Sequence, residues 1–194
     1  QMHSLVAMDA QNKHLTENIT WADNRSSRYA DLIENEYNGF EIYQRTGTPL
    51  HPMSPLSKIF WMKHEQPAIY NQTAKFADIK TYIFYQLFDK YVIDYSMASA
   101  TGMFNLEQLD WDEKALKLLG ISRDQLPELV PTTHILTGMK KRFAELMDID
   151  ENTPLVVGAS DGVLSNLGVN SYKKGEGAVT IGTSGAIRTV INKP

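Results

Sequence analysis

Residues 155–168, with the sequence LVVGASDGVLSNLG, place an acid between an apolar run and a helix-like run. The apolar residues up to Ala159 predict a buried strand, and the residues after Gly162 predict a helix. Ligands of α/β proteins bind at the carboxyl ends of strands, so Asp161 is a candidate catalytic acid or a metal ligand. The alternative, which is commoner on spacing alone, is that Asp161 only caps the helix.

A second glycine-bounded segment, residues 179–187 with the sequence VTIGTSGAI, predicts two strands joined by a hairpin turn. Gly182 and Gly185 flank the hydroxyl side chains of Thr183 and Ser184. The turn therefore offers N–H and O–H donors to an anion without steric hindrance. An ordinary turn is the commoner interpretation of this pattern, and the absence of a following lysine excludes a Walker loop.

Together, the two segments supply what phosphoryl transfer to an alcohol requires. A carboxylate accepts the proton of the hydroxyl group, while donors and Mg²⁺ stabilise charge on the transferring group. An aspartate with an ordinary pKa of about 4 is ionised at pH 7 and can accept that proton. The hypothesis depends on Asp161 and the 182–185 turn facing one cavity.

The composition is that of a globular protein, with 42% hydrophobic and 22% charged residues among 194. The net charge of −4 gives no basic surface for nucleic acid, and no apolar run approaches the ~20 residues that span a bilayer. The absence of cysteine excludes disulfides and favours a reducing compartment, so we expect a cytoplasmic protein. Both ends lie in strand-like runs, which indicates a piece of a longer protein.

The hydrophobic periodicity predicts an α/β protein with a helical middle and a glycine-rich, strand-rich end. We expect a strand at residues 4–8, a turn at Asp110, and Gly39 as the stop signal of the first helix. Helices are expected at residues 26–37, at 56–64, around 79–88, up to Gly120, and in KKRFAELMDI at 140–149.

Further motifs carry a resemblance that covers essentially the whole chain. They are QMHSLVAMD at residues 1–9, ITWADNRSSRYA at 19–30, TGTPLHPMSPLSKIFWMKHE at 46–65 and YVIDYSMASATGMFNLEQLDWDEKAL at 91–116. With the two glycine-bounded segments above, they resemble the FGGY family of carbohydrate kinases, and within it the branch that phosphorylates gluconate.

The resemblance implies an α/β actin-like ATPase core, built from two ribonuclease-H-like domains around a cleft. Residues 1–168 would form an incomplete first domain on the sugar-binding side. Residues 169–194 would open the second domain with its phosphate-binding hairpin. A phosphate-binding hairpin with a magnesium-associated aspartate, and the adenosine-binding half of the second domain, would be missing. The chain alone is therefore expected to be inactive.

The resemblance also assigns residues. Asp161 would be the general base, would contact the sugar, and would reach Mg²⁺ through water. Met2 and His3 would line the sugar site, with a looser match at Met53. The turn residues Gly182, Thr183, Ser184 and Gly185 would face the phosphates of ATP. The implied reaction is phosphorylation of D-gluconate at its 6-hydroxyl group, with ATP and Mg²⁺ as cofactors. The expected partner is a small-molecule sugar acid substrate, with neither nucleic acid nor membrane, and a homodimer is compatible with the resemblance.

Gluconate carries a carboxylate, so its kinase needs a cationic or donor-rich end to the sugar site. His3, Arg25, Arg45 and Lys58 are candidates. The last three would more commonly be solvated surface charges, and His3 could be a structural histidine. The three tryptophans, Trp21, Trp61 and Trp111, are interpreted as packing residues rather than sugar platforms.

Three alternatives to a gluconate kinase stay open on the sequence. The first is a kinase of the same family for xylulose or a related polyol. The second is a member that binds sugar or nucleotide without catalysis. The third is a structural domain in which Asp161 serves only as a helix cap.

Overall fold

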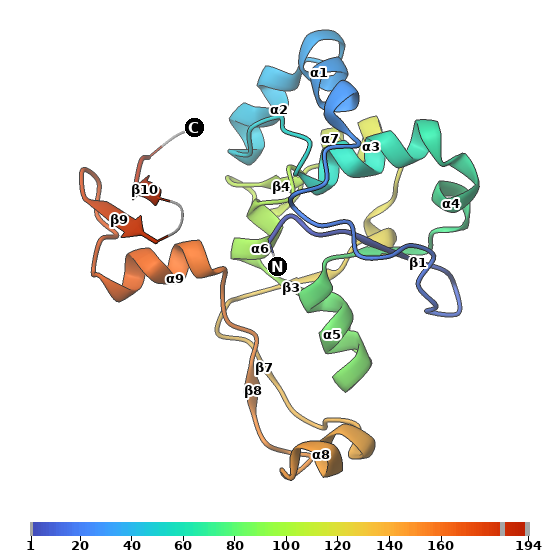
Figure 1. Cartoon of the computed structure of the whole chain (residues 1–194), viewed down its shortest axis with the longest axis vertical. Coiled ribbons are helices and arrows are strands. Elements are labelled where there is room, and N and C mark those ends of the chain that lie inside the picture. Colours follow the sequence, from blue (N-terminus) through green and yellow to red (C-terminus); the bar gives the residue numbers. More distant parts are fainter. Residues whose placement is uncertain (1, 183–184, 193–194) are drawn as a thin grey trace.

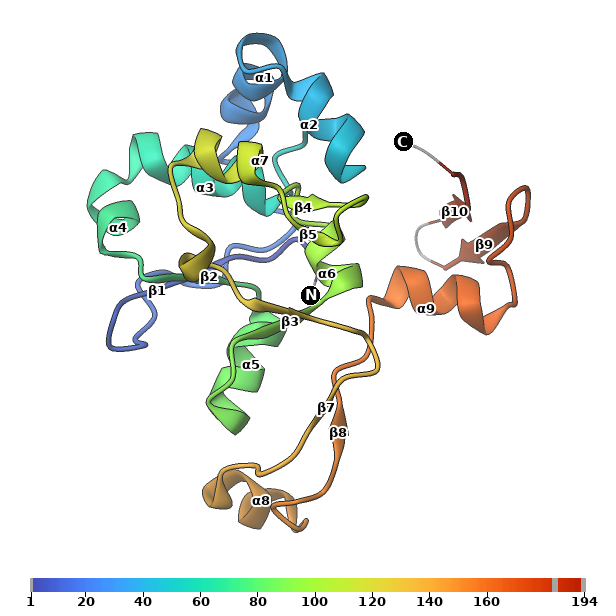
Figure 2. The same ribbon diagram turned by 180° about the vertical axis from the view of Figure 1, so that it is seen from behind.

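The computed structural model describes residues 2–182 and 185–192. Figures 1 and 2 show a main body that contains most of the helices, an arm that extends from it, and a helix with a β-hairpin at one side. Helices and strands both contribute, which confirms the expected α/β class. In this described part of the chain, no helix has both the length and the apolar character that crossing a bilayer requires.

Two strand pairs run through the body. Strand β1 (Val6–Met8) pairs antiparallel with β2 (Lys75–Ala77), and β3 (Val92–Asp94) pairs parallel with β6 (Glu128–Val130). The strand expected near the N-terminus is confirmed, and it is shorter than predicted. All three residues of β1 and all three of β3 are buried, as strands covered on both faces require.

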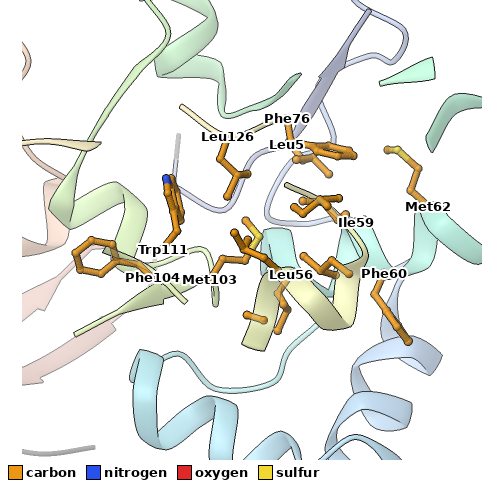
Figure 3. Close-up of a cluster of buried hydrophobic side chains, with 14 of the residues drawn as sticks. Leu5, Leu56, Ile59, Phe60, Met62, Phe76, Met103, Phe104, Trp111 and Leu126 are labelled. Atoms are coloured by element: carbon orange, nitrogen blue, oxygen red, sulfur yellow. The ribbon is translucent and has the colours of Figure 1, made fainter. Parts of the chain in front are cut away.

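The helical half of the body covers one side of these strands. It consists of α1 (Ser27–Glu36), α2 (Gly39–Thr46), α3 (Pro55–Glu65), α4 (Pro67–Gln72) and α7 (Glu113–Leu119). Helix α3 is buried along most of its first two turns because β1, α1 and α7 surround it. Figure 3 shows part of the main core, to which α3 contributes Leu56, Ile59, Phe60 and Met62. The other labelled core residues are Leu5, Phe76, Met103, Phe104, Trp111 and Leu126.

Contrary to the prediction, Gly39 does not end the first helix; it begins the second helix, α2. The break between α1 and α2 lies at Asn38, whose φ of 54° is left-handed. A Cβ atom at Gly39 would lie 2.5 Å from the Cα atom of Glu34. The glycine is therefore required by the close approach of two helices, a role that a stop-signal interpretation of glycine overlooks.

The turn predicted at Asp110 is also displaced. Strand β4 (Phe104–Asn105) pairs antiparallel with β5 (Asp110–Trp111), so Asp110 is paired and the turn occupies the residues between them. Leu109 has a φ of 51°. Ser122 precedes a short 3-10 helix, Arg123–Gln125.

Helix α5 (Ile79–Phe88) leads into β3, and α6 (Tyr95–Ser99) follows it directly. The arm consists of strands β7 (Ile135–Leu136) and β8 (Leu155–Val156) with α8 (Lys141–Met147) between them. A second, smaller core joins the arm to α5; it contains Phe84, Leu87, Phe88, Val92, Val130, Leu136, Met139, Ala144 and Val157. The strand that leads to Asp161 is thereby tied to α5.

A buried ion pair joins α2 to the start of α7. The carboxylate of Asp112 caps α7 by accepting from the backbone N–H of Ala115, and it also accepts from Arg45 at 2.7 and 3.1 Å and from Asn105 at 3.0 Å. Burial alone would raise the pKa of Asp112, but these hydrogen bonds outweigh it, so the pKa is lowered.

We predict that Arg45→Met lowers the free energy of unfolding by about 3 kcal/mol at pH 7, because it leaves a buried carboxylate without its cation. Since the pKa of Asp112 is lowered in the folded state, this contribution is present above the unfolded pKa of about 4 and is lost as the pH falls below it. Urea unfolding at pH 7 and pH 3 measures both effects.

The matched control is Arg123→Met, which removes the exposed ion pair with Asp110. This substitution should cost less than about 1 kcal/mol. Equal losses for the two arginine variants would contradict the assignment of Arg45 as the compensating cation.

Candidate functional site

Asp161 is the first residue of α9 (Asp161–Gly168), and Ser160 occupies the N-cap position. Asp161 is therefore not the helix cap, because Ser160, one position earlier, is the N-cap residue. Its Oδ1 atom accepts a hydrogen bond from the backbone N–H of Gly162 at 2.8 Å, and Oδ2 has no partner among the described residues. The side chain is exposed. A carboxylate oxygen is thus free to accept a proton from a ligand.

A cavity of about 320 Å³ adjoins this carboxylate. Asp161 and Met2 line it together, although they lie near opposite ends of the chain. The other lining residues are Lys80, Met97, Val157, Ala159, Ser160 and Leu164. A cavity of this size accommodates a sugar, and it offers both apolar and charged walls.

His3 lies next to Met2 but does not line this cavity. Its φ of 63° is left-handed, and its Nδ1 atom is buried without a hydrogen-bond partner among the described residues. Burial lowers the pKa of His3; a hydrogen bond to the Ala100 backbone opposes this effect, and the charges of Lys58 and His51 add to it. His3 is therefore neutral at pH 7, where it can hydrogen-bond a hydroxyl group but cannot serve as the expected cation.

Lys58 is fully buried in α3 and is not a solvated surface charge. Its Nζ atom donates to the backbone carbonyls of His3, of Thr20 at 2.8 Å and of Ile19 at 3.3 Å. An ammonium group has three N–H donors, so these carbonyls saturate it. Lys58 holds the chain at His3 beside the chain at Thr20 and is not free to bind a substrate carboxylate.

The two arginine candidates are also engaged elsewhere. Arg25 forms an ion pair with Asp23 at 2.7 Å and lies over the ring of Trp61 at 5.1 Å. Arg45 is bound to Asp112. The cation that does line the cavity with Asp161 is Lys80, which the sequence interpretation missed.

The tryptophans divide into two kinds. Trp111 is 3% exposed and Trp61 packs against the main core, as predicted. Trp21 is 64% exposed, so its interpretation as a packing residue is wrong. Lys58 binds the backbone carbonyls of both His3 and Thr20, so the backbone just before Trp21 lies close to that of His3.

Met53 lies in the loop before α3 and is half-buried. Its backbone N–H donates to Nδ1 of His51 at 3.2 Å, and the charge of His51 acts on His3. The loop therefore approaches the His3 side of the site. Met53 does not line the cavity that contains Asp161.

The predicted hairpin forms, with β9 (Gly177–Ile181) antiparallel to β10 (Gly185–Thr189). Gly182 and Gly185 bound its turn, whereas Thr183 and Ser184 lie outside the described residues. The hairpin lies beside α9 in both views of the chain (Figures 1 and 2). Arg188 of β10 packs against Gly162, since a Cβ atom added to Gly162 would lie 3.3 Å from Nε of Arg188. The guanidinium group of Arg188 also donates to the hydroxyl of Thr180 at 3.1 Å. Arg188 and Gly162 line a different cavity, and the Asp161 cavity is lined by neither Gly182 nor Gly185, so the described residues do not place the turn and the carboxylate on one cavity.

Within residues 2–182 and 185–192, no three His, Asp or Glu side chains gather into a metal site. Magnesium usually binds proteins through one or two carboxylates, keeps several waters and takes its other ligands from substrate phosphates. The free Oδ2 atom of Asp161 fits such a single-carboxylate role.

The comparisons with known proteins show the family and the fold. Residues 1–168 match the N-terminal domain of the FGGY family of carbohydrate kinases. The chain is 61% identical over 193 residues to a gluconokinase of Bacillus subtilis, covering 100% of this chain and 38% of that protein. The chain therefore spans well under half the length of this curated relative.

Two solved structures from Lactobacillus acidophilus superpose on the whole chain. A ligand-bound xylulose kinase has a TM-score of 0.96 and 39% identity, and the match covers 40% of that chain. A gluconate kinase has a TM-score of 0.95 and 39% identity, and the match covers 39% of that chain. The fold expected from the sequence resemblance is thereby confirmed.

We predict an unusual pH dependence of stability from Lys58. Burial lowers its pKa from 10.5 to about 8; the charge of Asp23 opposes this effect and that of Arg25 adds to it. Between about pH 8 and 10.5 the unfolded chain retains a proton that the folded chain has lost, so stability rises with pH in this window. The free energy of unfolding, relative to that of Lys58→Met, should increase by up to about 1.4 kcal/mol per pH unit. Urea unfolding at pH 7, 8.5 and 10 measures it, and a difference that stays constant would contradict the prediction.

Proposed function

The chain belongs to the FGGY family of carbohydrate kinases, and we propose that the protein containing it transfers the γ-phosphoryl group of ATP to the 6-hydroxyl group of D-gluconate. The observation that carries the chemistry is the free carboxylate of Asp161 on the wall of the 320 Å³ cavity. The choice of gluconate is supported by the 61% identity to a gluconokinase over the whole chain.

Asp161 is proposed as the general base. It accepts the proton of the sugar hydroxyl as that oxygen attacks the γ-phosphorus in line with the leaving group. Oδ1 is held by the N–H of Gly162, so Oδ2 is the atom that receives the proton. Mg²⁺, when bound, supplies charge neutralisation at the phosphates.

The remaining walls bind the sugar in this proposal. Met2 provides an apolar surface in the cavity, and His3, which follows Met2 and has its Nδ1 atom buried outside the cavity, supports this wall from behind. Trp21 has an exposed ring, and an exposed indole is suited to cover the apolar face of a sugar chain.

The phosphates of ATP belong on the hairpin side. Gly182 and Gly185 bound the turn and carry no side chains that would block a phosphate oxygen, and Arg188 supplies a positive charge beside Gly162. In the proposed division, residues 1–168 belong to the sugar-binding domain and residues 169–194 open the nucleotide-binding one.

Replacing the base tests the mechanism. We expect Asp161→Asn in the full-length protein to lower kcat by about 10³-fold or more, because an amide cannot accept the proton, and to change KM for the sugar by less than about threefold. Steady-state kinetics with saturating ATP measures both constants. Turnover within tenfold of the wild type would remove Asp161 from the role of base.

A substrate panel tests the sugar. We expect gluconate to have a higher kcat/KM than xylulose, glycerol and other uncharged polyols with the full-length protein, by at least about 100-fold. The similarity to a xylulose kinase structure makes xylulose the competing substrate. A preference for an uncharged ketose would contradict gluconate as the substrate while leaving the kinase assignment intact. Binding of ATP and sugar without product would favour a non-catalytic family member.

A further inference from the structure

Asp94 carries a second carboxylate at the end of a strand, and it is completely buried. It ends β3 and caps α6, where Oδ1 accepts from the N–H groups of Ser96 at 3.0 Å and Met97 at 3.1 Å and from the hydroxyl of Ser96. Oδ2 accepts from Nζ of Lys80 at 2.6 Å. Four donors thus compensate the burial of this charge.

Both side chains that bind Asp94 also bind the backbone just before Asp161. Nζ of Lys80 donates to the carbonyl of Gly158 at 3.2 Å. The Oγ atom of Ser96 gives its proton to Asp94 and accepts the N–H of Ser160 at 2.9 Å. The residue between these two points, Ala159, is therefore held on both sides by contacts that converge on one carboxylate.

The backbone up to Gly158 is also held by the residues just before β7, because the N–H groups of Val157 and Gly158 donate to the carbonyls of His134 and Thr132, both at 2.9 Å. Gly158 has a left-handed φ of 72°, and Ser160 makes no side-chain bond to the end of α9. The Asp161 side chain itself binds only its neighbour Gly162 among the described residues. The location of the Asp161 carboxylate thus depends on where the backbone at residues 158–160 is fixed.

We propose that Asp94, acting through Lys80 and Ser96, is a positioning residue that fixes Asp161 for proton transfer. The proposal rests on the proposed function only in requiring Asp161 to be the base; it is independent of which sugar is phosphorylated. A displacement of about 1 Å at a reacting group can cost about 100-fold in rate. The clamp formed by Asp94, Lys80 and Ser96 acts at that scale, because its contacts end one and three residues before Asp161.

The two side chains that connect Asp94 to the backbone before Asp161 can be substituted separately in the full-length protein. Lys80→Met removes the cation and retains the apolar stem, while Ser96→Ala removes only a hydroxyl group. We expect kcat to fall about 10- to 100-fold for Lys80→Met and about 3- to 10-fold for Ser96→Ala, with KM for sugar and ATP changed by less than about threefold. Lys80→Arg, which retains a cation and several donors, should restore part of the loss.

The decisive measurement combines each substitution with Asp161→Asn. If the clamp acts through Asp161, neither substitution lowers kcat further once the base is gone, because the effects of residues that act as a unit are not additive. Losses of equal size in both backgrounds, a change in KM alone, or an unchanged kcat would overturn the proposal. The matched control is Lys140→Met, which removes the ion pair between Lys140 on the arm and Asp89 at the end of α5. This variant should leave kcat unchanged.

A readout that does not need activity separates this proposal from the proposed function. The amide N–H of Ser160 is bonded to Ser96, so its hydrogen exchange should become at least tenfold faster in Ser96→Ala and in Lys80→Met. Unchanged exchange in both variants would overturn the clamp. A wild-type protein that phosphorylates no sugar would instead contradict the proposed function, and the exchange result would still decide the clamp.

Discussion

The approach to α9 depends on the completely buried carboxylate of Asp94. A carboxylate can be taken out of water only if donors replace its hydration, and here the donors come from Lys80 on α5 and from Ser96 and Met97 on α6. Satisfying this one group fixes the end of β3, the start of α6 and the side chain of Lys80. The approach to α9 is fixed in consequence, because the same partners hold it.

The candidate site is assembled from segments that are distant in sequence and held mainly through their backbones. Met2 comes from the start of the chain, Lys80 from α5 and Asp161 from α9, yet they line one cavity. Lys58 secures the His3 side in the same manner, by saturating its donors with carbonyls. Side chains that face the cavity are thus supported by neighbours that do not enter it, as a preorganised site requires.

The sequence predicts the class of fold, and it predicts that a helix begins at Asp161, because both depend on local patterns. It cannot predict the partners of the cations, since Lys58 and Arg45 bind groups that are far away along the chain. Trp21 was misjudged because size indicates burial only on average, whereas its exposure is set by the tertiary fold. Asp94 shares the signal that identified Asp161, an acid between an apolar strand and a helix of small residues, and could have been found by the same rule.

The acceptors of Lys58 have a consequence for how this region can change during evolution. All three are main-chain carbonyls, which every amino acid supplies, so no substitution at His3, Ile19 or Thr20 can remove them or replace the lysine. A lost ion pair can be repaired by altering its partner, but here there is no side-chain partner to alter. A substitution of Lys58 is therefore not expected to be compensated by a change at the residues it contacts, while the side chains at positions 3, 19 and 20 can vary without loss of these hydrogen bonds.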